Sequence, residues 1–123
     1  MIMKFLLDAN FLLAPVQFRV DIYSELARFG KHELYTLSLV LEELERMASG
    51  HSRKSRQAKL ALALAKKAHV TVIQARGQAD KAILRIAKGK FVVCTQDTAL
   101  KSRLRKSKIP VVTIRQKKYL AIE

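Results

Sequence analysis

Short apolar runs alternate along this chain with longer segments in which apolar residues recur every three or four positions. The runs have the length and composition of buried β-strands and lie at residues 2–7, 34–37, 70–73, 91–94 and 110–114. The longer segments predict amphipathic helices at residues 10–13, 21–29, 38–49, 56–68, 79–87 and 97–107, the first of them limited by Pro15. Strands that alternate with helices pair in parallel, so we expect an α/β three-layer sandwich with a five-stranded parallel sheet.

Carboxylate side chains stand where three of the predicted strands end. Asp8 directly follows the first strand, Asp80 opens the helix after the third, and Asp97 follows the fourth. Parallel strands have their carboxyl ends at one edge of the sheet, where α/β proteins bind ligands, so we expect these acids to lie together. Glu43, in the helix after the second strand, lies beside the apolar stripe of that helix, whereas Glu42 lies on the opposite side. Glu43 is therefore expected to join the three aspartates.

Four acids at one place limit what the site can do. Like charges that are buried together repel, so the cluster is stable only if some carboxyls stay protonated or a cation lies among them. Hard oxygen ligands select Mg²⁺ or Mn²⁺, and such an ion can deliver hydroxide and stabilise a phosphoryl-transfer transition state. Asn10 and Thr95 are polar residues beside the acids and are predicted to support them. Each aspartate taken alone is also explained by its place at the start of a helix, and Glu43 by an ion pair with Lys or Arg; only their shared edge favours chemistry.

The length and composition restrict the class of protein. The chain has 123 residues, half of them hydrophobic, which predicts one folded domain over residues 1–123. No apolar run approaches the roughly 20 residues that span a bilayer, so we expect no membrane partner. The single cysteine, Cys94, excludes an intrachain disulfide and favours a reducing, cytoplasmic location. No Cys or His pair has the spacing of a zinc site.

The chain is strongly basic. Its 24 Lys and Arg residues exceed its 10 Asp and Glu residues, and the formal net charge of +14 indicates an anionic partner. An acidic centre within a basic surface is the electrostatic pattern of an enzyme that hydrolyses phosphodiester bonds in nucleic acid. We hypothesise that a set of basic side chains contacts the RNA backbone, a solvated helix face being the alternative. The set is Arg53, Lys54, Arg56, Lys81, Lys101, Arg103, Arg105, Lys117 and Lys118.

Four segments match, in order, the motifs of a known family. Residues 5–10 resemble the opening motif of PIN-domain ribonucleases, and residues 41–45 resemble their second acidic motif, in which Glu precedes Leu. Residues 79–83 and 94–100 are similar to the third and fourth motifs. The closing residues 109–120 are similar to the end of the archaeal and eukaryotic rRNA-processing branch of the family, so the resemblance covers nearly the whole chain.

The resemblance implies a parallel sheet of strand order 3-2-1-4-5, a divalent metal ion and endonucleolytic cleavage of RNA. It also implies a ribosomal RNA precursor as substrate and a homodimer as assembly. By position, the metal-site carboxylates would be Asp8, Glu43, Asp80 and Asp97. Two positions depart from the family: Ala9 stands where it usually has Thr or Ser, and Lys81 where this branch often has a second Asp. The lysine either weakens metal binding or contacts phosphate.

Three other functions fit parts of the same pattern. The first is the toxin ribonuclease of a toxin–antitoxin pair (VapC type), which would bring an antitoxin partner. The second is a catalytically weak PIN-like module that binds RNA in a ribosome-assembly complex, independently of metal. The third is a phospho-receiver domain, which needs a phosphorylatable Asp after the third strand and a paired acid near the first. Asp80 lies inside the following helix and only Asp8 is near the first strand, which argues against this third function.

Overall fold

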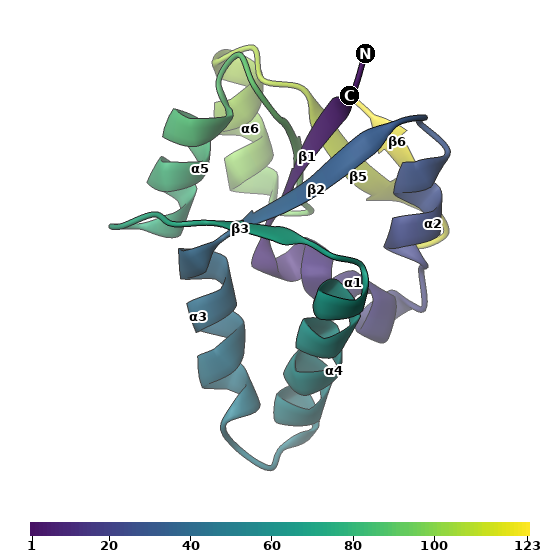
Figure 1. Cartoon of the computed structure of the whole chain (residues 1–123), viewed down its shortest axis with the longest axis vertical. Coiled ribbons are helices and arrows are strands. Elements are labelled where there is room, and N and C mark those ends of the chain that lie inside the picture. The colour runs from purple at the N-terminus through teal and green to yellow at the C-terminus, as the bar shows by residue number, and fades with distance from the viewer.

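The structure is a computed structural model that describes all residues from 1 to 123. The chain folds into one β-sheet with helices on both faces (Figure 1). The strands are β1 (Met3–Leu7), β2 (His32–Leu37), β3 (Thr71–Ile73), β4 (Val92–Cys94), β5 (Val111–Arg115) and β6 (Tyr119–Ile122). The helices are α1 (Ala9–Phe18), α2 (Ile22–Ala27), α3 (Ser38–Ala48), α4 (Arg53–Lys67), α5 (Ala79–Ala87) and α6 (Thr98–Lys106). Helices α1, α3 and α4 contact one another, and α5 contacts α6. No helix has both the length and the apolar character to cross a membrane.

The strand order in the sheet is β3-β2-β1-β4-β5-β6, and the strands from β3 to β5 are parallel. The predicted fold class and the order 3-2-1-4-5 are confirmed. The sheet also has a sixth strand, β6, which is antiparallel to β5, so the prediction of a wholly parallel five-stranded sheet was wrong at this edge. The reason lies in the turn between β5 and β6, which contains no glycine or asparagine to mark it.

The β5–β6 turn is tight although its residues are not typical turn formers. Gln116 and Lys117 both have a φ of 55°, and the Lys118 N–H donates to the Arg115 carbonyl over 3.0 Å. Two consecutive left-handed residues suit the twist of a hairpin, but this conformation costs about 1 kcal/mol or more at each residue with a side chain. The ammonium group of Lys117 lies 5.5 Å from the centre of the Phe18 ring, a contact that favours the turn.

We expect Gln116→Asn to raise the free energy of unfolding by about 0.5–1 kcal/mol, because asparagine adopts the left-handed conformation more easily than glutamine. The control is Gln116→Val, which places a stiff β-branched residue in the same conformation and is expected to lower the free energy of unfolding. Urea denaturation of both variants beside the wild type measures the changes. Equal stability of the two variants would show that the turn is not strained.

Helix α1 continues through the proline that was predicted to limit it. Pro15 lies inside the helix, although proline lacks the N–H that would bond to the Phe11 carbonyl. Phe11 and Leu12 are fully buried, and the burial of α1 in the core outweighs the lost hydrogen bond. Helix α4 also differs from the prediction and begins three residues earlier, at Arg53, because the Ser52 hydroxyl caps its first turn.

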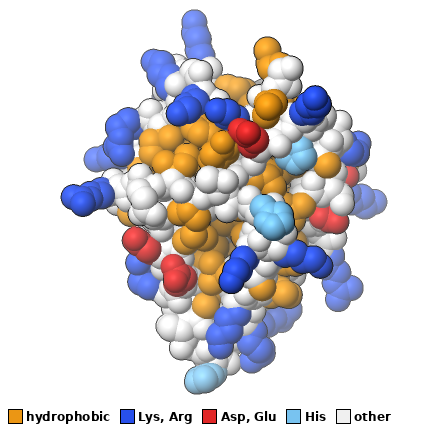
Figure 2. Space-filling model, in the orientation of Figure 1, with side chains coloured by type: hydrophobic (Ala, Val, Ile, Leu, Met, Phe, Trp, Pro, Cys, Tyr) orange, Lys and Arg blue, Asp and Glu red, His pale blue; other side chains and the backbone are white.

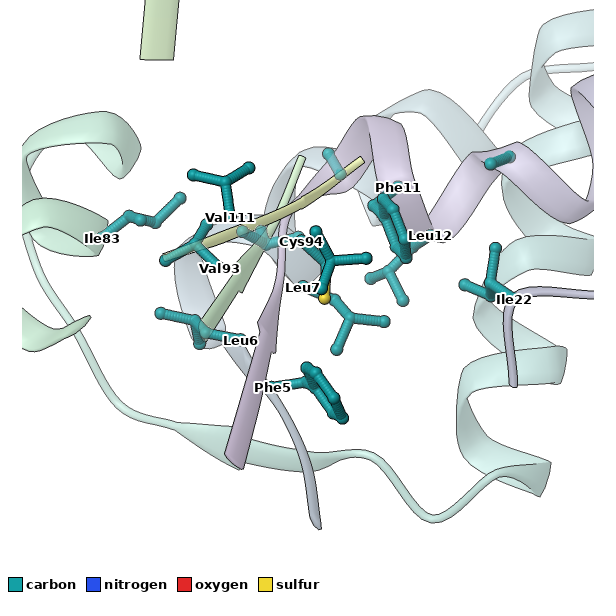
Figure 3. Close-up of a cluster of buried hydrophobic side chains, with 14 of the residues drawn as sticks. Phe5, Leu6, Leu7, Phe11, Leu12, Ile22, Ile83, Val93, Cys94 and Val111 are labelled. Carbon is teal, nitrogen blue, oxygen red and sulfur yellow. The ribbon is translucent and has the colours of Figure 1, made fainter. Parts of the chain in front are cut away.

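The central strand β1 lies in the middle of the hydrophobic core (Figure 3). Its last three residues, Phe5, Leu6 and Leu7, are fully buried, with β2 and β4 paired on either side. Figure 3 shows Leu6 on the side of Ile83, a residue of α5, and Leu7 on the side of α1. The strand therefore leads the chain out of the core at its carboxyl end, where Asp8 is the next residue.

Candidate active site

A small cleft lies at the carboxyl ends of the parallel strands, with a volume of about 120 Å³. It is lined by Asp8, Ala9, Asn10, Val40, Glu43, Ala79, Asp80, Ile83 and Asp97. The structure thus brings the four predicted carboxylates to one place. A larger cavity of about 350 Å³, between α3, α4 and β3, is mostly apolar and contains one acid, Glu45, so it offers no cluster of charged ligands.

Asp8 is the most constrained of the four acids and is only 7% exposed. One carboxylate oxygen accepts from the Phe11 N–H at 2.9 Å and caps α1, and the other accepts from the Thr95 hydroxyl. Burial raises the pKa of Asp8 to about 6; the charges of Asp97 and Asp80 act in the same direction, and the two hydrogen bonds oppose them. A carboxylate held in this way is stabilised by a cation beside it at neutral pH.

Thr95 links Asp8 to Asp97. Its fully buried hydroxyl donates to Asp8 and accepts from the Asp97 N–H at 3.1 Å. Asp97 in turn caps α6, since its Oδ1 accepts from the Leu100 N–H at 2.9 Å, and its Oδ2 is left for a ligand. The expected supporting role of Thr95 thus has a geometric basis. Asn10, by contrast, is exposed at the rim of the cleft and makes no side-chain hydrogen bond to the protein.

Glu43 and Asp80 line the cleft from two helices. Glu43 lies one turn after Val40 in α3 and is exposed, although its position beside the apolar stripe favours the inward side of the helix. Because α3 begins where β2 ends, its first turns border the cleft, and Glu43 lines the cleft from the solvent side. Asp80 lies in the first turn of α5 and is half-buried.

None of these four acids has a basic partner, although the chain carries 24 Lys and Arg residues. The ion pairs of the structure involve other acids, namely Glu25 with Arg28, and Glu123 with Arg105 and Arg115. Four neighbouring carboxylates free of Lys and Arg make a locally negative hollow in a protein of net charge +14. A cation bound among these carboxylates would lower their mutual repulsion.

The donor set fits a small, hydrated divalent cation. All four side chains offer hard carboxylate oxygens, the ligands that Mg²⁺ and Mn²⁺ prefer. No three Asp, Glu, His or Cys side chains stand close enough to enclose an ion by themselves. Mg²⁺ is usually held by one or two carboxylates and keeps several water molecules, so the cleft fits a hydrated ion better than a dehydrated one.

The predicted RNA-contacting residues do not form one continuous rim around the cleft. Arg53, Lys54 and Arg56 lie at the tip of the α3–α4 hairpin, which projects away from the sheet (Figure 1). Lys81 is exposed on α5 and directly follows Asp80 of the cleft. Figure 2 shows Lys and Arg side chains around the border of one face of the molecule and apolar side chains at its centre.

Some of the predicted RNA contacts already have partners within the protein. Arg105 forms an ion pair with Glu123 at 2.5 Å, and the Lys101 ammonium lies 3.4 Å from the Thr113 hydroxyl. Lys117 lies over an aromatic ring of α1, as described above. The remaining members of this C-terminal group are exposed, namely Arg103 and Lys118.

Thr36 is a buried polar residue that the sequence pattern did not identify. It lies in β2, and its hydroxyl donates to the carbonyl of Leu7 at 2.7 Å. The N–H of the same peptide unit, which belongs to Asp8, donates to the Cys94 carbonyl of β4 at 3.2 Å. Both neighbouring strands therefore fix the point where Asp8 leaves the sheet. Thr36 stands between Tyr35 and Leu37 in the strand predicted at residues 34–37, and a buried hydroxyl there needs a hydrogen-bond partner, which is the signal that could have identified it.

The chain is similar over most of its length to proteins of one family. The model of the family described as "PIN like domain" matches residues 5–117. Ribonuclease VapC4 of Methanocaldococcus jannaschii is 39% identical over 126 aligned residues, which cover 97% of this chain and 95% of that protein.

Two solved structures share the fold. The PIN domain endonuclease Utp24 has a TM-score of 0.80 and 24% identity, over 98% of this chain and 90% of that one. A domain of a functionally unknown protein from Methanocaldococcus jannaschii has a TM-score of 0.69 and 15% identity, over 92% of this chain and 91% of that one. Together with the motifs and the acidic cleft, the family match shows that the chain belongs to the PIN-like domain family.

Proposed function

We propose that this chain is a metal-dependent endoribonuclease that hydrolyses phosphodiester bonds in RNA. The observation that carries the proposal is a hollow with four carboxylates and no basic partner, in a protein of net charge +14. The acids would hold the cation, and the basic exterior would attract the RNA backbone. Membership of the PIN-like family and the 39% identity to a protein named as a ribonuclease support the same activity.

The residues of the cleft have different tasks in this proposal. Asp8 and Asp97, each held at the start of a helix, would be the fixed ligands of Mg²⁺ or Mn²⁺. Glu43 and Asp80 make no hydrogen bond through their side chains, so they are free to turn toward the ion or a water molecule. When bound, the ion supplies an activated water molecule and stabilises the charge on the phosphate. Lys81 would contact a phosphate group of the substrate at the rim.

Two cellular roles are compatible with this activity. The closing residues 109–120 resemble the rRNA-processing branch of the family, which favours a ribosomal RNA precursor as substrate. The identity to Ribonuclease VapC4 favours the second role, a toxin with an antitoxin partner. Growth arrest on expression, relieved by the product of a neighbouring gene, would identify the toxin. Normal growth on expression, with accumulation of unprocessed precursor after deletion, would identify the first role.

The test of the activity compares two adjacent glutamates of α3. Glu43→Gln is expected to lower the rate of RNA cleavage in Mg²⁺ or Mn²⁺ about 100-fold, because Glu43 lines the cleft. Glu42→Gln is the matched control; it removes the same charge from an exposed position outside the cleft and is expected to change the rate by less than about twofold. Both are assayed on single-stranded and structured RNA, with a chelator as the metal-free arm.

Two outcomes would contradict the proposal. Cleavage that persists in chelator would show that the activity does not depend on a metal ion. Equal cleavage by Glu43→Gln and Glu42→Gln would show that Glu43 is not part of the active site. RNA binding without cleavage by the wild type, unchanged by chelator, would instead identify the catalytically weak RNA-binding module.

A further inference from the structure

Strand β4 stops pairing with β5 just before the cleft. The last backbone hydrogen bond of the pair runs from the Thr95 N–H to the Val112 carbonyl at 3.1 Å. A parallel ladder would continue with bonds from the Ile114 N–H to the Thr95 carbonyl and from the Asp97 N–H to the Ile114 carbonyl. Neither forms, and the Asp97 N–H donates to the Thr95 hydroxyl instead. Ile114 is buried, so both of its backbone groups need other partners.

The side chain of Gln96 supplies both partners. Its Oε1 accepts from the Ile114 N–H at 2.5 Å, and its Nε2 donates to the Ile114 carbonyl at 3.4 Å. The same Oε1 accepts from the hydroxyl of Thr113, a buried residue of β5, at 2.6 Å. A side-chain amide offers the same kinds of donor and acceptor as a peptide unit. Gln96 therefore ends the β4–β5 ladder without leaving a buried backbone group unpaired.

The hydrogen bonds of the Gln96 side chain take the place of backbone hydrogen bonds to Ile114, and this determines the path of residues 95–97 toward the cleft. Because Gln96 satisfies Ile114, the Asp97 N–H is free to donate to the Thr95 hydroxyl, which itself donates to Asp8. We propose that Gln96 is a positioning residue, whose amide holds Asp97 and, through Thr95, Asp8 in the arrangement that cleavage requires. The effect of Gln96 on cleavage rests on the proposed function, whereas its effect on the geometry of residues 95–97 does not.

Gln96→Met tests the inference, because methionine has a similar length and no amide. We expect kcat for RNA cleavage to fall about 100-fold while KM changes by less than about threefold, because the acids move and the RNA-binding surface does not. In the metal-free protein, we expect the backbone amides of Ile114 and Asp97 to exchange with deuterium faster than in the wild type, as measured by NMR.

Ser55→Ala is the matched control for a general loss of stability. Ser55 is a buried residue of α4 that lies outside the cleft. The substitution removes its hydroxyl, which forms a hydrogen bond with the Ser52 hydroxyl at 3.0 Å. This variant is expected to keep the wild-type kcat and the wild-type exchange of both amides.

The two readouts separate this inference from the proposed function. If the wild type cleaves no RNA, the proposed function fails, and faster exchange of the Asp97 amide in Gln96→Met still supports the positioning role. Unchanged exchange and unchanged kcat in a folded Gln96→Met protein would overturn the inference. If Gln96→Met does not fold, Thr113→Val takes its place, because it removes one of the two hydrogen bonds that Oε1 accepts. That variant is expected to show a smaller fall in kcat at unchanged KM, and no fall would overturn the inference.

Discussion

Replacing Asp8 by asparagine is expected to lower the rate of RNA cleavage by about 1,000-fold or more without disturbing the fold. Asparagine is nearly the same size, and its Oδ1 can still accept from the Phe11 N–H and cap α1. It lacks the negative charge that would hold a divalent cation in the cleft. The loss should therefore appear in kcat and persist when the concentration of Mg²⁺ or Mn²⁺ is raised. Single-turnover cleavage of RNA over a series of metal concentrations measures it.

Asp21 provides the matched control for this substitution. It caps α2 as Asp8 caps α1, since its Oδ1 accepts from the Ser24 N–H at 3.1 Å, but it is exposed and lies outside the cleft. Asp21→Asn is expected to cleave RNA at the wild-type rate. Full activity of Asp8→Asn, or an equal loss of cleavage rate in Asp8→Asn and Asp21→Asn, would show that Asp8 is not part of the active site.

The metal-free protein is expected to lose stability as the pH rises from about 4 to about 7. Burial raises the pKa of Asp8 from its ordinary value of 3.8 to about 6, so in this range the folded chain keeps a proton that the unfolded chain releases. The free energy of unfolding falls with rising pH wherever the folded state binds more protons. At about 1.4 kcal/mol for each pKa unit, this carboxyl lowers the free energy of unfolding by about 3 kcal/mol at neutral pH.

Urea denaturation in the presence of a chelator, across this pH range, measures the loss, and Asp8→Asn isolates it. The variant is expected to be more stable than the wild type at neutral pH and to lack the decline. Hydrogen bonds from Ser24 and Arg105 lower the pKa of the carboxyls of Asp21 and Glu123. The stability that these two groups contribute is lost as the pH falls, in the acid range below the titration of Asp8.

Added Mg²⁺ provides a second arm of the same measurement. A ligand that binds only the folded state stabilises it, so Mg²⁺ is expected to restore the stability of the wild type at neutral pH and to leave Asp8→Asn unchanged. A wild type that gains stability with rising pH relative to Asp8→Asn would contradict the assignment of the raised pKa to this residue.

The strand ends were predictable because they depend on a local pattern. Asp8, Asp80 and Asp97 each follow a short apolar run, and parallel pairing then brings them to one edge of the sheet. Helical periodicity also separated Glu43 from Glu42, and the structure places only the first of these in the cleft. The exposure of Glu43 was not predictable, because it depends on where α3 meets the sheet.

Features that depend on contacts between distant segments could not be predicted. Pro15 stays inside α1 because burial in the core outweighs the local preference to end the helix. In the sequence, Gln96 looks like an ordinary loop residue, and only its contact with Ile114 of β5 in the folded chain gives it a structural role. Arg105 belongs to a basic run that indicates RNA binding, yet Glu123 from the end of the chain pairs with it. In each case the deciding partner lies outside the local sequence pattern.

The capping role of Asp8 and Asp97 limits how these two acids can bind an ion. Each has one oxygen already engaged by a backbone N–H at the start of a helix, α1 or α6. Asp97 offers its other oxygen, whereas the other oxygen of Asp8 also accepts from the Thr95 hydroxyl, so each carboxylate is expected to act as a monodentate donor. Ca²⁺ takes about six to eight oxygens and favours bidentate carboxylates, whereas Mg²⁺ takes single oxygens in a compact octahedron. We therefore expect the two helix caps to favour Mg²⁺ over Ca²⁺ in the cleft before any substrate is bound.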